Sequence, residues 1–206
     1  MKIEIKKSIK PVNYLDAIKF LEERVDKINK NEANELIWLL EHPAIFTAGT
    51  SYNENDVLDK SINIIKTSRG GKITWHGPGQ LICYLAINLN SRNKDIRKFI
   101  NIIENSIISS LNTFGIKSKS DRDNIGIWTK LANKDMKVSA IGIKVKRWIA
   151  YHGFSINIDN DISNYKKIIP CGIKDKGITT LKNVYKQDYY NFPNEIIKNL
   201  IANLEN

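Results

Sequence analysis

Residues 137–158, KVSAIGIKVKRWIAYHGFSINI, contain two largely apolar segments, Lys137–Val145 and Trp148–Ile158. Each has the length and composition of a β-strand. Only two residues separate them, so we expect the two strands to pair as a β-hairpin. A hairpin pairs its strands antiparallel, and this stretch therefore predicts that the sheet of the protein is largely antiparallel.

Further strands and helices are expected on both sides of this hairpin, from the spacing of apolar residues and from Gly and Pro boundaries. The expected strands are Lys2–Ile9, Glu35–Leu40, Asn63–Thr67, Leu81–Leu89 and Asn124–Trp128. The expected helices are Tyr14–Ile28, Asp95–Phe114 with Gly115 at its end, and two shorter ones near Ile178–Val184 and Asn194–Leu204. This order predicts one α+β domain over residues 1–206, with a mixed, largely antiparallel sheet and flanking helices.

Length and composition limit the class of protein. A chain of 206 residues with 42% hydrophobic composition can bury one core, which favours a single domain. The sequence has no apolar run of 18 residues, so we expect no transmembrane helix. The start, MKIEIKK, lacks the pattern of a signal or transit peptide. Two cysteines do not make a disulfide framework, which predicts a reducing, cytoplasmic setting.

The formal net charge of +10 has three possible explanations. Abundant Lys, Asn and Ile indicate a general compositional bias, and a basic face could also attract acidic protein partners. Nucleic-acid binding ranks last, because the sequence has no concentrated Lys/Arg tract and no nucleic-acid motif. We therefore expect neither nucleic acid nor a membrane as a partner.

Residues 69–80, RGGKITWHGPGQ, form a segment rich in glycine. Four of the eleven glycines of the chain lie here, and glycine lets a backbone approach a ligand closely. The spacing is neither the Walker pattern nor Gly-x-Gly-x-x-Gly, so a phosphate cradle is not indicated. A thin slot for a narrow substrate fits the segment better than an ordinary Gly/Pro loop does.

Two cysteines have different expected roles. Cys171 lies between Pro170 and Gly172, where a sharp turn would leave room for backbone donors beside a thiolate. It is the candidate nucleophile. Cys83 lies within the apolar strand Leu81–Leu89, where a cysteine usually serves as a small buried hydrophobic residue.

The three histidines, His42, His76 and His152, all lie in short segments marked by Gly or Pro. No pair of His or Cys residues has the spacing of metal ligands, so we expect no metal. The histidines are better explained as hydrogen-bonding members of a pocket wall, most of all His76 and least of all His42. From the residues alone, Lys137 is better explained as an ordinary solvated lysine at a strand end, although a lysine beside an apolar strand can be partly desolvated.

Four segments occurring in this order closely resemble the octanoyltransferases of lipoate biosynthesis, within the biotin/lipoate protein ligase superfamily. They are Arg69–Gln80, Lys137–Gly142, His152–Asn157 and Pro170–Gly172. His42-Pro43 through Gly49 is similar to a further motif of that family, so the resemblance spans roughly residues 35–184. The fold that it implies is a mixed α/β single domain of the biotin/lipoate protein ligase type.

The resemblance implies a reaction and a set of site residues. Octanoyl would pass from octanoyl-acyl carrier protein to Cys171 as a thioester, and then to the target lysine of a lipoyl domain, in 2-oxoacid dehydrogenase complexes or the glycine cleavage H protein. Lys137 would favour the thiolate of Cys171, and no cofactor would be needed. The implied acyl-site residues are Arg69, Gly70, Gly71, Lys72, Ile73, Thr74, Trp75, His76, Ala140, Ile141, Gly142, Gly153, Phe154 and Ser155.

Three alternatives remain at this point. An ATP-dependent lipoate or octanoate ligase of the same superfamily would use no cysteine nucleophile. A non-catalytic module that binds acyl carrier protein would keep the slot without needing Cys171, and a basic RNA-binding domain would show salt-sensitive affinity. Trp75, where many relatives have another ring, and Thr180, where serine is common, leave the preference for acyl chain length open.

Overall fold

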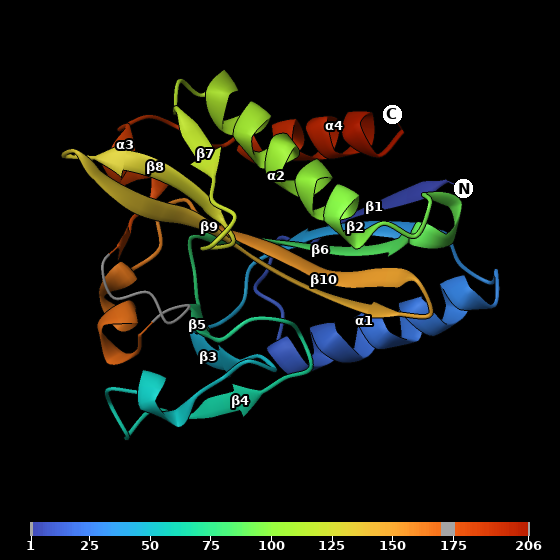
Figure 1. Cartoon of the computed structure of the whole chain (residues 1–206), viewed down its shortest axis with the longest axis horizontal. Coiled ribbons are helices and arrows are strands. Elements are labelled where there is room, and N and C mark those ends of the chain that lie inside the picture. Colours follow the sequence, from blue (N-terminus) through green and yellow to red (C-terminus); the bar gives the residue numbers. More distant parts are fainter. Residues whose placement is uncertain (1, 170–175, 206) are drawn as a thin grey trace.

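The main sheet of the computed structural model, which describes residues 2–169 and 176–205, crosses the whole molecule (Figure 1). Within the described residues its strand order is β1-β2-β6-β10-β9-β8-β7, with β11 paired to β9. The strands are β1 (Ile3–Lys7), β2 (Glu35–Leu40), β6 (Gln80–Asn88), β7 (Ser118–Ser120), β8 (Ile127–Leu131), β9 (Lys134–Lys146), β10 (Ile149–Asn157) and β11 (Gly177–Ile178). Among the described strands of this sheet, only β1–β2 and β9–β11 pair in parallel, so the sheet is mixed and largely antiparallel, as the sequence predicts.

A second, smaller sheet lies at one end of the first and carries the glycine-rich segment (Figure 1). Its order is β4-β3-β5, with strands β3 (Ile45–Ala48), β4 (Ile64–Lys66) and β5 (Ile73–His76). Phe46 of β3 pairs opposite Trp75 of β5. Both side chains pack into a separate apolar cluster with Tyr165 and Ile168. This sheet therefore has a small core of its own.

Helices cover both faces of the main sheet (Figure 1). Helix α1 (Tyr14–Asn29) packs on one face, and α2 (Ile96–Thr113) and α4 (Phe192–Glu205) pack together on the other. Successive side chains of a strand point to opposite faces. In β2, Leu36, Trp38 and Leu40 accordingly join the core under α1, whereas Ile37 and Leu39 join the core under α2 and α4. Shorter helical segments are Glu54–Asp56, Leu89–Ser91, Ile162–Lys167 and α3 (Leu181–Val184).

The structure corrects several sequence-based expectations. The expected helix Ile178–Val184 is partly strand: Ile178 pairs with Lys137 in β11, and only Leu181–Val184 is helical. The expected strand Asn124–Trp128 begins later, at Ile127, because the side chain of Asp121 accepts hydrogen bonds from the next backbone N–H groups and closes a turn. Strands β3, β5 and β7 were not expected. In contrast, the bounds of β2 and the start of α1 are as predicted.

Candidate functional site

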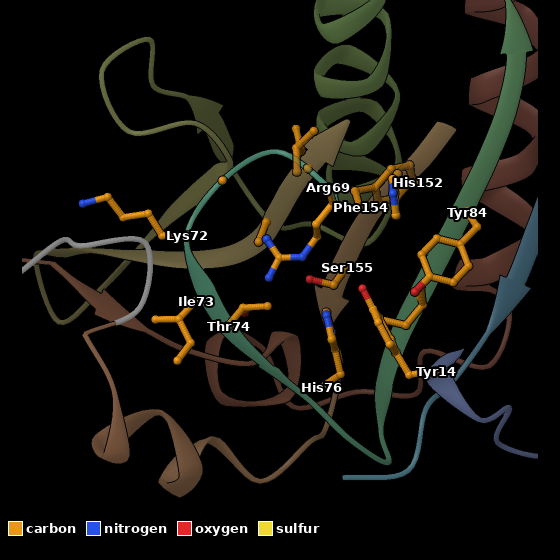
Figure 2. A pocket seen from close by; sticks show the side chains of 16 residues that line it. Tyr14, Arg69, Lys72, Ile73, Thr74, His76, Tyr84, His152, Phe154 and Ser155 are labelled. Carbon is orange, nitrogen blue, oxygen red and sulfur yellow. The ribbon is translucent and has the colours of Figure 1, made fainter. Parts of the chain in front are cut away.

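A pocket lies between the glycine-rich segment and the hairpin of β9 and β10 (Figure 2). It contains about 550 Å³ of space not occupied by atoms, part of it open to solvent. Its lining residues are Tyr14, Arg69, Gly71, Lys72, Ile73, Thr74, His76, Ile82, Tyr84, Ala140, Ile141, Gly142, His152, Gly153, Phe154 and Ser155. Segments far apart in the sequence thus converge on one cavity.

Glycines bring two backbone segments into direct contact beside this pocket. A Cβ atom added to Gly70 would lie 2.9 Å from the carbonyl oxygen of Ile143, and one added to Gly142 would lie 3.1 Å from the carbonyl oxygen of Gly70. Larger residues at either position would push the segments apart. The glycine-rich segment therefore lies closely against β9, and the pocket between them is narrow.

Arg69 holds the glycine-rich segment in place from within. Its guanidinium Nη2 donates hydrogen bonds to the carbonyl and the hydroxyl oxygens of Thr47, at 2.8 and 2.9 Å, and Nη1 donates to the carbonyl of Gly70. The backbone N–H of Gly49 donates to the carbonyl of Lys72. The Thr47-Ala48-Gly49 motif thus acts as a support for the segment that lines the pocket.

Tyr84 lines the pocket, whereas His42, which the sequence indicated as a member of the pocket wall, does not line it and contacts Tyr84 instead. Nδ1 of His42 lies 2.7 Å from the carbonyl oxygen of Val12, which can only accept, so this nitrogen carries the proton. Nε2 of His42 must then accept, and the hydroxyl of Tyr84 donates to it at 2.7 Å. Burial lowers the pKa of His42 and raises the pKa of Tyr84 well above its usual range. Both groups are therefore neutral, with the tautomer of His42 fixed by its contacts.

His76 lies on β5 with its ring directed toward the pocket (Figure 2). The side-chain amide of Gln80 donates to Asn157, so its oxygen accepts, and Nδ1 of His76 donates to it at 2.6 Å. Burial, with the charge of Arg69 also acting, lowers the pKa of His76 to about 3. His76 is therefore a neutral ring whose Nε2 is left as a hydrogen-bond acceptor at the pocket.

Lys137 lies in a groove that adjoins the pocket and shares Gly71, Lys72, Ile141 and Gly142 with it. The side chain is buried although it carries an amine, and Nζ donates to the carbonyl of Ile125 at 2.9 Å. Nζ also lies 4.8 Å from the centre of the Trp128 ring. The backbone of Lys137 is fixed by pairing with Ile178 and by the N–H of Thr179. Lys137 is thus a desolvated lysine beside the pocket, not a solvated strand-end lysine.

The structure brings together most of the acyl-site residues that the sequence indicated. Of those residues, all but Gly70 and Trp75 line the pocket. Gly70 lines the adjoining groove, and Trp75 packs on the other side of β5, where its ring centre is 5.9 Å from that of Tyr165. Cys171, with Pro170 and Gly172, lies outside the described residues.

Four lining residues, Tyr14, Ile82, Tyr84 and His152, were not among the indicated acyl-site residues. Tyr14 and Tyr84 carry no motif that would mark them, whereas His152 directly precedes the indicated Gly153. Cys83 is fully buried in the core, and burial raises the pKa of its thiol, which confirms its expected role as a buried hydrophobic residue.

Two kinds of feature are absent from the residues that the structure describes. Among residues 2–169 and 176–205, no cluster of three or more His, Cys, Asp or Glu side chains could hold a metal ion. In the same ranges, no helix has the length and the apolar composition needed to cross a membrane.

Comparison with known proteins agrees with this geometry. Residues 13–204 match the lipoyl protein ligase A/B catalytic domain family. A bipartite lipoate protein ligase from Thermoplasma acidophilum has a TM-score of 0.72 at 11% identity, covering 100% of this chain and 84% of that one. A biotin protein ligase from Aquifex aeolicus has a TM-score of 0.53 at 14% identity, covering 99% of this chain and 69% of that one. These likenesses establish the expected biotin/lipoate protein ligase-like fold.

Fold and pocket thus define an enzyme of the lipoyl protein ligase A/B catalytic class. An octanoyltransferase from Wolbachia sp. subsp. Brugia malayi is 42% identical over 192 residues, which are 87% of this chain and 94% of the relative. The chain belongs to the octanoyltransferase family, whose members are acyltransferases. The resemblance seen in the sequence motifs is thereby confirmed.

Proposed function

We propose that this chain takes octanoyl from octanoyl-acyl carrier protein onto Cys171 and passes it to the target lysine of a lipoyl domain. The acceptors would be the lipoyl domains of 2-oxoacid dehydrogenase complexes and the glycine cleavage H protein. The observation that carries this proposal is the narrow pocket lined by the family-type segments, with the buried amine of Lys137 in the adjoining groove. The small number of cysteines supports a cytoplasmic setting for the reaction.

The acyl chain fits the apolar part of the pocket. Ile73, Ile82, Ala140 and Phe154 line it, and each buried CH₂ group contributes about 0.8 kcal/mol to binding. Gly71 and Gly142 line the same cavity without side chains, so their backbone can lie directly against a bound chain. The pocket therefore supports binding of a linear acyl group with its carbonyl toward Lys137.

The proposed reaction has two acyl-transfer steps. The thiolate of Cys171 attacks the donor carbonyl, a new C–S bond forms, and the pantetheine thiol leaves with a proton. The lysine amine of the lipoyl domain then attacks the enzyme thioester, a C–N bond forms, and the Cys171 sulfur leaves. Lys137 would stabilise the thiolate as an ammonium group and would give its proton to the departing pantetheine sulfur. The resulting neutral amine would then accept the proton that the lysine of the lipoyl domain loses, which restores the ammonium group beside the Cys171 thiolate. Both steps start from a thioester, so ATP is not required.

Intact-mass measurement of the protein mixed with octanoyl-acyl carrier protein, without ATP, tests this proposal. We expect an octanoyl adduct that thiols remove and that maps to Cys171, and its absence from Cys171→Ala, with Cys83→Ala as the matched control. Failure to form the adduct, together with activity on free octanoate and ATP, would move the chain to the ligases. Failure in both assays would instead favour a non-catalytic binding module.

A further inference from the structure

His152 adopts an unusual backbone conformation within β10. Its φ is 67°, in the left-handed region that residues other than glycine seldom occupy. Side chains of neighbouring strand residues normally point to opposite faces. The rings of Tyr151 and His152 instead stack, with centres 4.8 Å apart and planes inclined by 19°. The conformation therefore turns the imidazole toward the pocket, where Tyr84 also lies, with ring centres 6.5 Å apart.

The next residue makes this conformation possible. A Cβ atom on Gly153 would lie 1.9 Å from the carbonyl oxygen of Cys83 on the neighbouring strand β6, so only glycine fits there. Strained backbone of this kind is maintained only where the surrounding structure imposes it, and it is often found at functional sites. The strand is thus built to direct the side chain of His152.

The imidazole of His152 is buried without a hydrogen bond. Its exposed fraction is 1%, and neither Nδ1 nor Nε2 has a partner among the described residues. His42 and His76, in contrast, each have hydrogen-bond partners. Buried polar side-chain atoms nearly always have partners. Two unpartnered ring nitrogens at the wall of a ligand pocket therefore indicate that a ligand supplies the missing partner.

Burial, with smaller effects of the Arg69 and Lys144 charges, lowers the pKa of His152 to about 3. The ring is accordingly neutral near pH 7. A neutral imidazole has one N–H donor and one nitrogen acceptor. A hydroxyl group, which both donates and accepts, is the simplest partner for it.

The strand register places His152 away from the reacting end of the pocket. Lys137 precedes Ala140 on β9, and Ala140 pairs with Ser155 on β10, whereas His152 pairs with Ile143. Ala140 and Ile143 are three residues apart on β9, which corresponds to about 10 Å along a strand, and Lys137 lies three residues further from Ile143. An extended eight-carbon chain is about 9 Å long, with single bonds of about 1.5 Å. An octanoyl chain whose carbonyl lies beside Ala140, on the Lys137 side of the pocket, would thus end just before the imidazole.

We infer that His152 forms a polar subsite at the far end of the acyl pocket, which binds a hydrogen-bonding group at the ω-end of the chain. This inference rests on the proposed function, which places the acyl chain in this pocket. An octanoyl group stops short of the ring nitrogens. One more methyl group would cover them without supplying a partner, whereas an ω-hydroxyl group would supply it. ω-Hydroxylated medium-chain acyl thioesters are accordingly the further substrate class.

A comparison of two donors with the unmodified enzyme tests the inference. Nonanoyl- and 8-hydroxyoctanoyl-acyl carrier protein have acyl chains with the same number of non-hydrogen atoms and differ in the terminal group. We expect kcat/KM, measured by mass spectrometry of the acylated lipoyl domain, to be about tenfold higher for 8-hydroxyoctanoyl. Equal values, or a preference for nonanoyl, would overturn the subsite, because an apolar pocket end disfavours a hydroxyl group.

Variants of His152 distinguish the effect of the ring nitrogens on donor preference from the effect of the shape of the side chain. His152→Phe keeps an aromatic ring beside Tyr151 but removes both nitrogens, and we expect it to prefer nonanoyl. His152→Asn keeps a polar group and suits a positive φ, and we expect it to retain the preference for 8-hydroxyoctanoyl. An unchanged preference in His152→Phe would assign the effect to another residue. Octanoyl transfer by the unmodified enzyme is the reference: its loss contradicts the proposed function, whereas transfer without hydroxyl preference contradicts only the subsite.

Discussion

Substitution of Gly153 by alanine tests the link between the sheet and the pocket. The added Cβ would lie 1.9 Å from the carbonyl oxygen of Cys83, whereas ordinary contacts begin at 3.4 Å, so the two strands must separate by about 3.4 − 1.9 = 1.5 Å at this point. Strand β10 is paired on its other side with β9 and cannot move away from β6 without disturbing that pairing. The strain therefore remains in the folded protein.

Two contributions set the size of the effect. Overpacking of a well-packed core costs about 1–3 kcal/mol, and a positive φ at a residue with a Cβ adds about 1–2 kcal/mol. The φ of Gly153 is 158°, so both contributions apply. We expect Gly153→Ala to lower the free energy of unfolding by roughly 2–5 kcal/mol, and the melting temperature by roughly 10 °C for a chain of this length.

Urea unfolding and thermal melting measure this loss, and Gly115→Ala is the matched control. Gly115 also has a positive φ, 74°, but no atom lies within 4 Å of its added Cβ. The control therefore reports backbone strain alone, about 1–2 kcal/mol. Octanoyl transfer should fall in Gly153→Ala and remain in Gly115→Ala. If Gly153→Ala melts no lower than Gly115→Ala, the collision with β6 is relieved at little cost and the reasoning is refuted.

Three further predictions concern single side chains. Lys137→Met should lower the rate of octanoyl transfer at least about 100-fold without unfolding the protein, whereas substitution of Lys134, an exposed lysine of the same strand, by Met should leave the rate near that of wild type. Comparable transfer rates in the two variants would exclude a role for the Lys137 amine. Arg92→Leu should lower the free energy of unfolding in urea by about 3–5 kcal/mol, because it leaves the fully buried carboxylate of Glu35 without the guanidinium that now donates to Oε1 and Oε2 at 2.5 and 2.9 Å. A decrease below about 1 kcal/mol would contradict this. His76 has a pKa of about 3 in the folded protein and about 6.5 in the unfolded chain, so between these values only the unfolded chain binds the proton, and the free energy of unfolding decreases as the pH is lowered, by up to about 1.4 kcal/mol per pH unit. Unfolding of His76→Gln should depend less on pH between pH 7 and pH 5, and an equal slope would contradict the assignment.

Long elements with regular apolar spacing could be predicted from the sequence. The bounds of Glu35–Leu40 and the first residue of the helix at Tyr14 are as expected, because a fully buried strand and an amphipathic helix each leave a local pattern. Strands Ile45–Ala48 and Ile73–His76 leave no such pattern. They are four residues long, and they exist because they pair with each other in the second sheet.

For the site, the motifs located the segments but not the direction of each side chain. Thr74 and Trp75 are neighbours in one motif, yet Thr74 lines the pocket and Trp75 packs against Tyr165. The alternation of a strand separates them, and that strand could not be recognised in a glycine-rich segment. The residues alone likewise favoured a solvated Lys137, whereas the side chain is buried, because its neighbours Ile125 and Trp128 come from other segments.

By itself, the sequence determined the fold class, the family and the segments that form the pocket, since these depend on local apolar periodicity and on motifs read in order. Only the tertiary structure decided that His152 turns toward the pocket without a hydrogen bond. Its positive φ is stable because Gly153 lies against the backbone of Cys83 on a different strand. Close approach between strands is a property of the assembled sheet, and no local pattern encodes it.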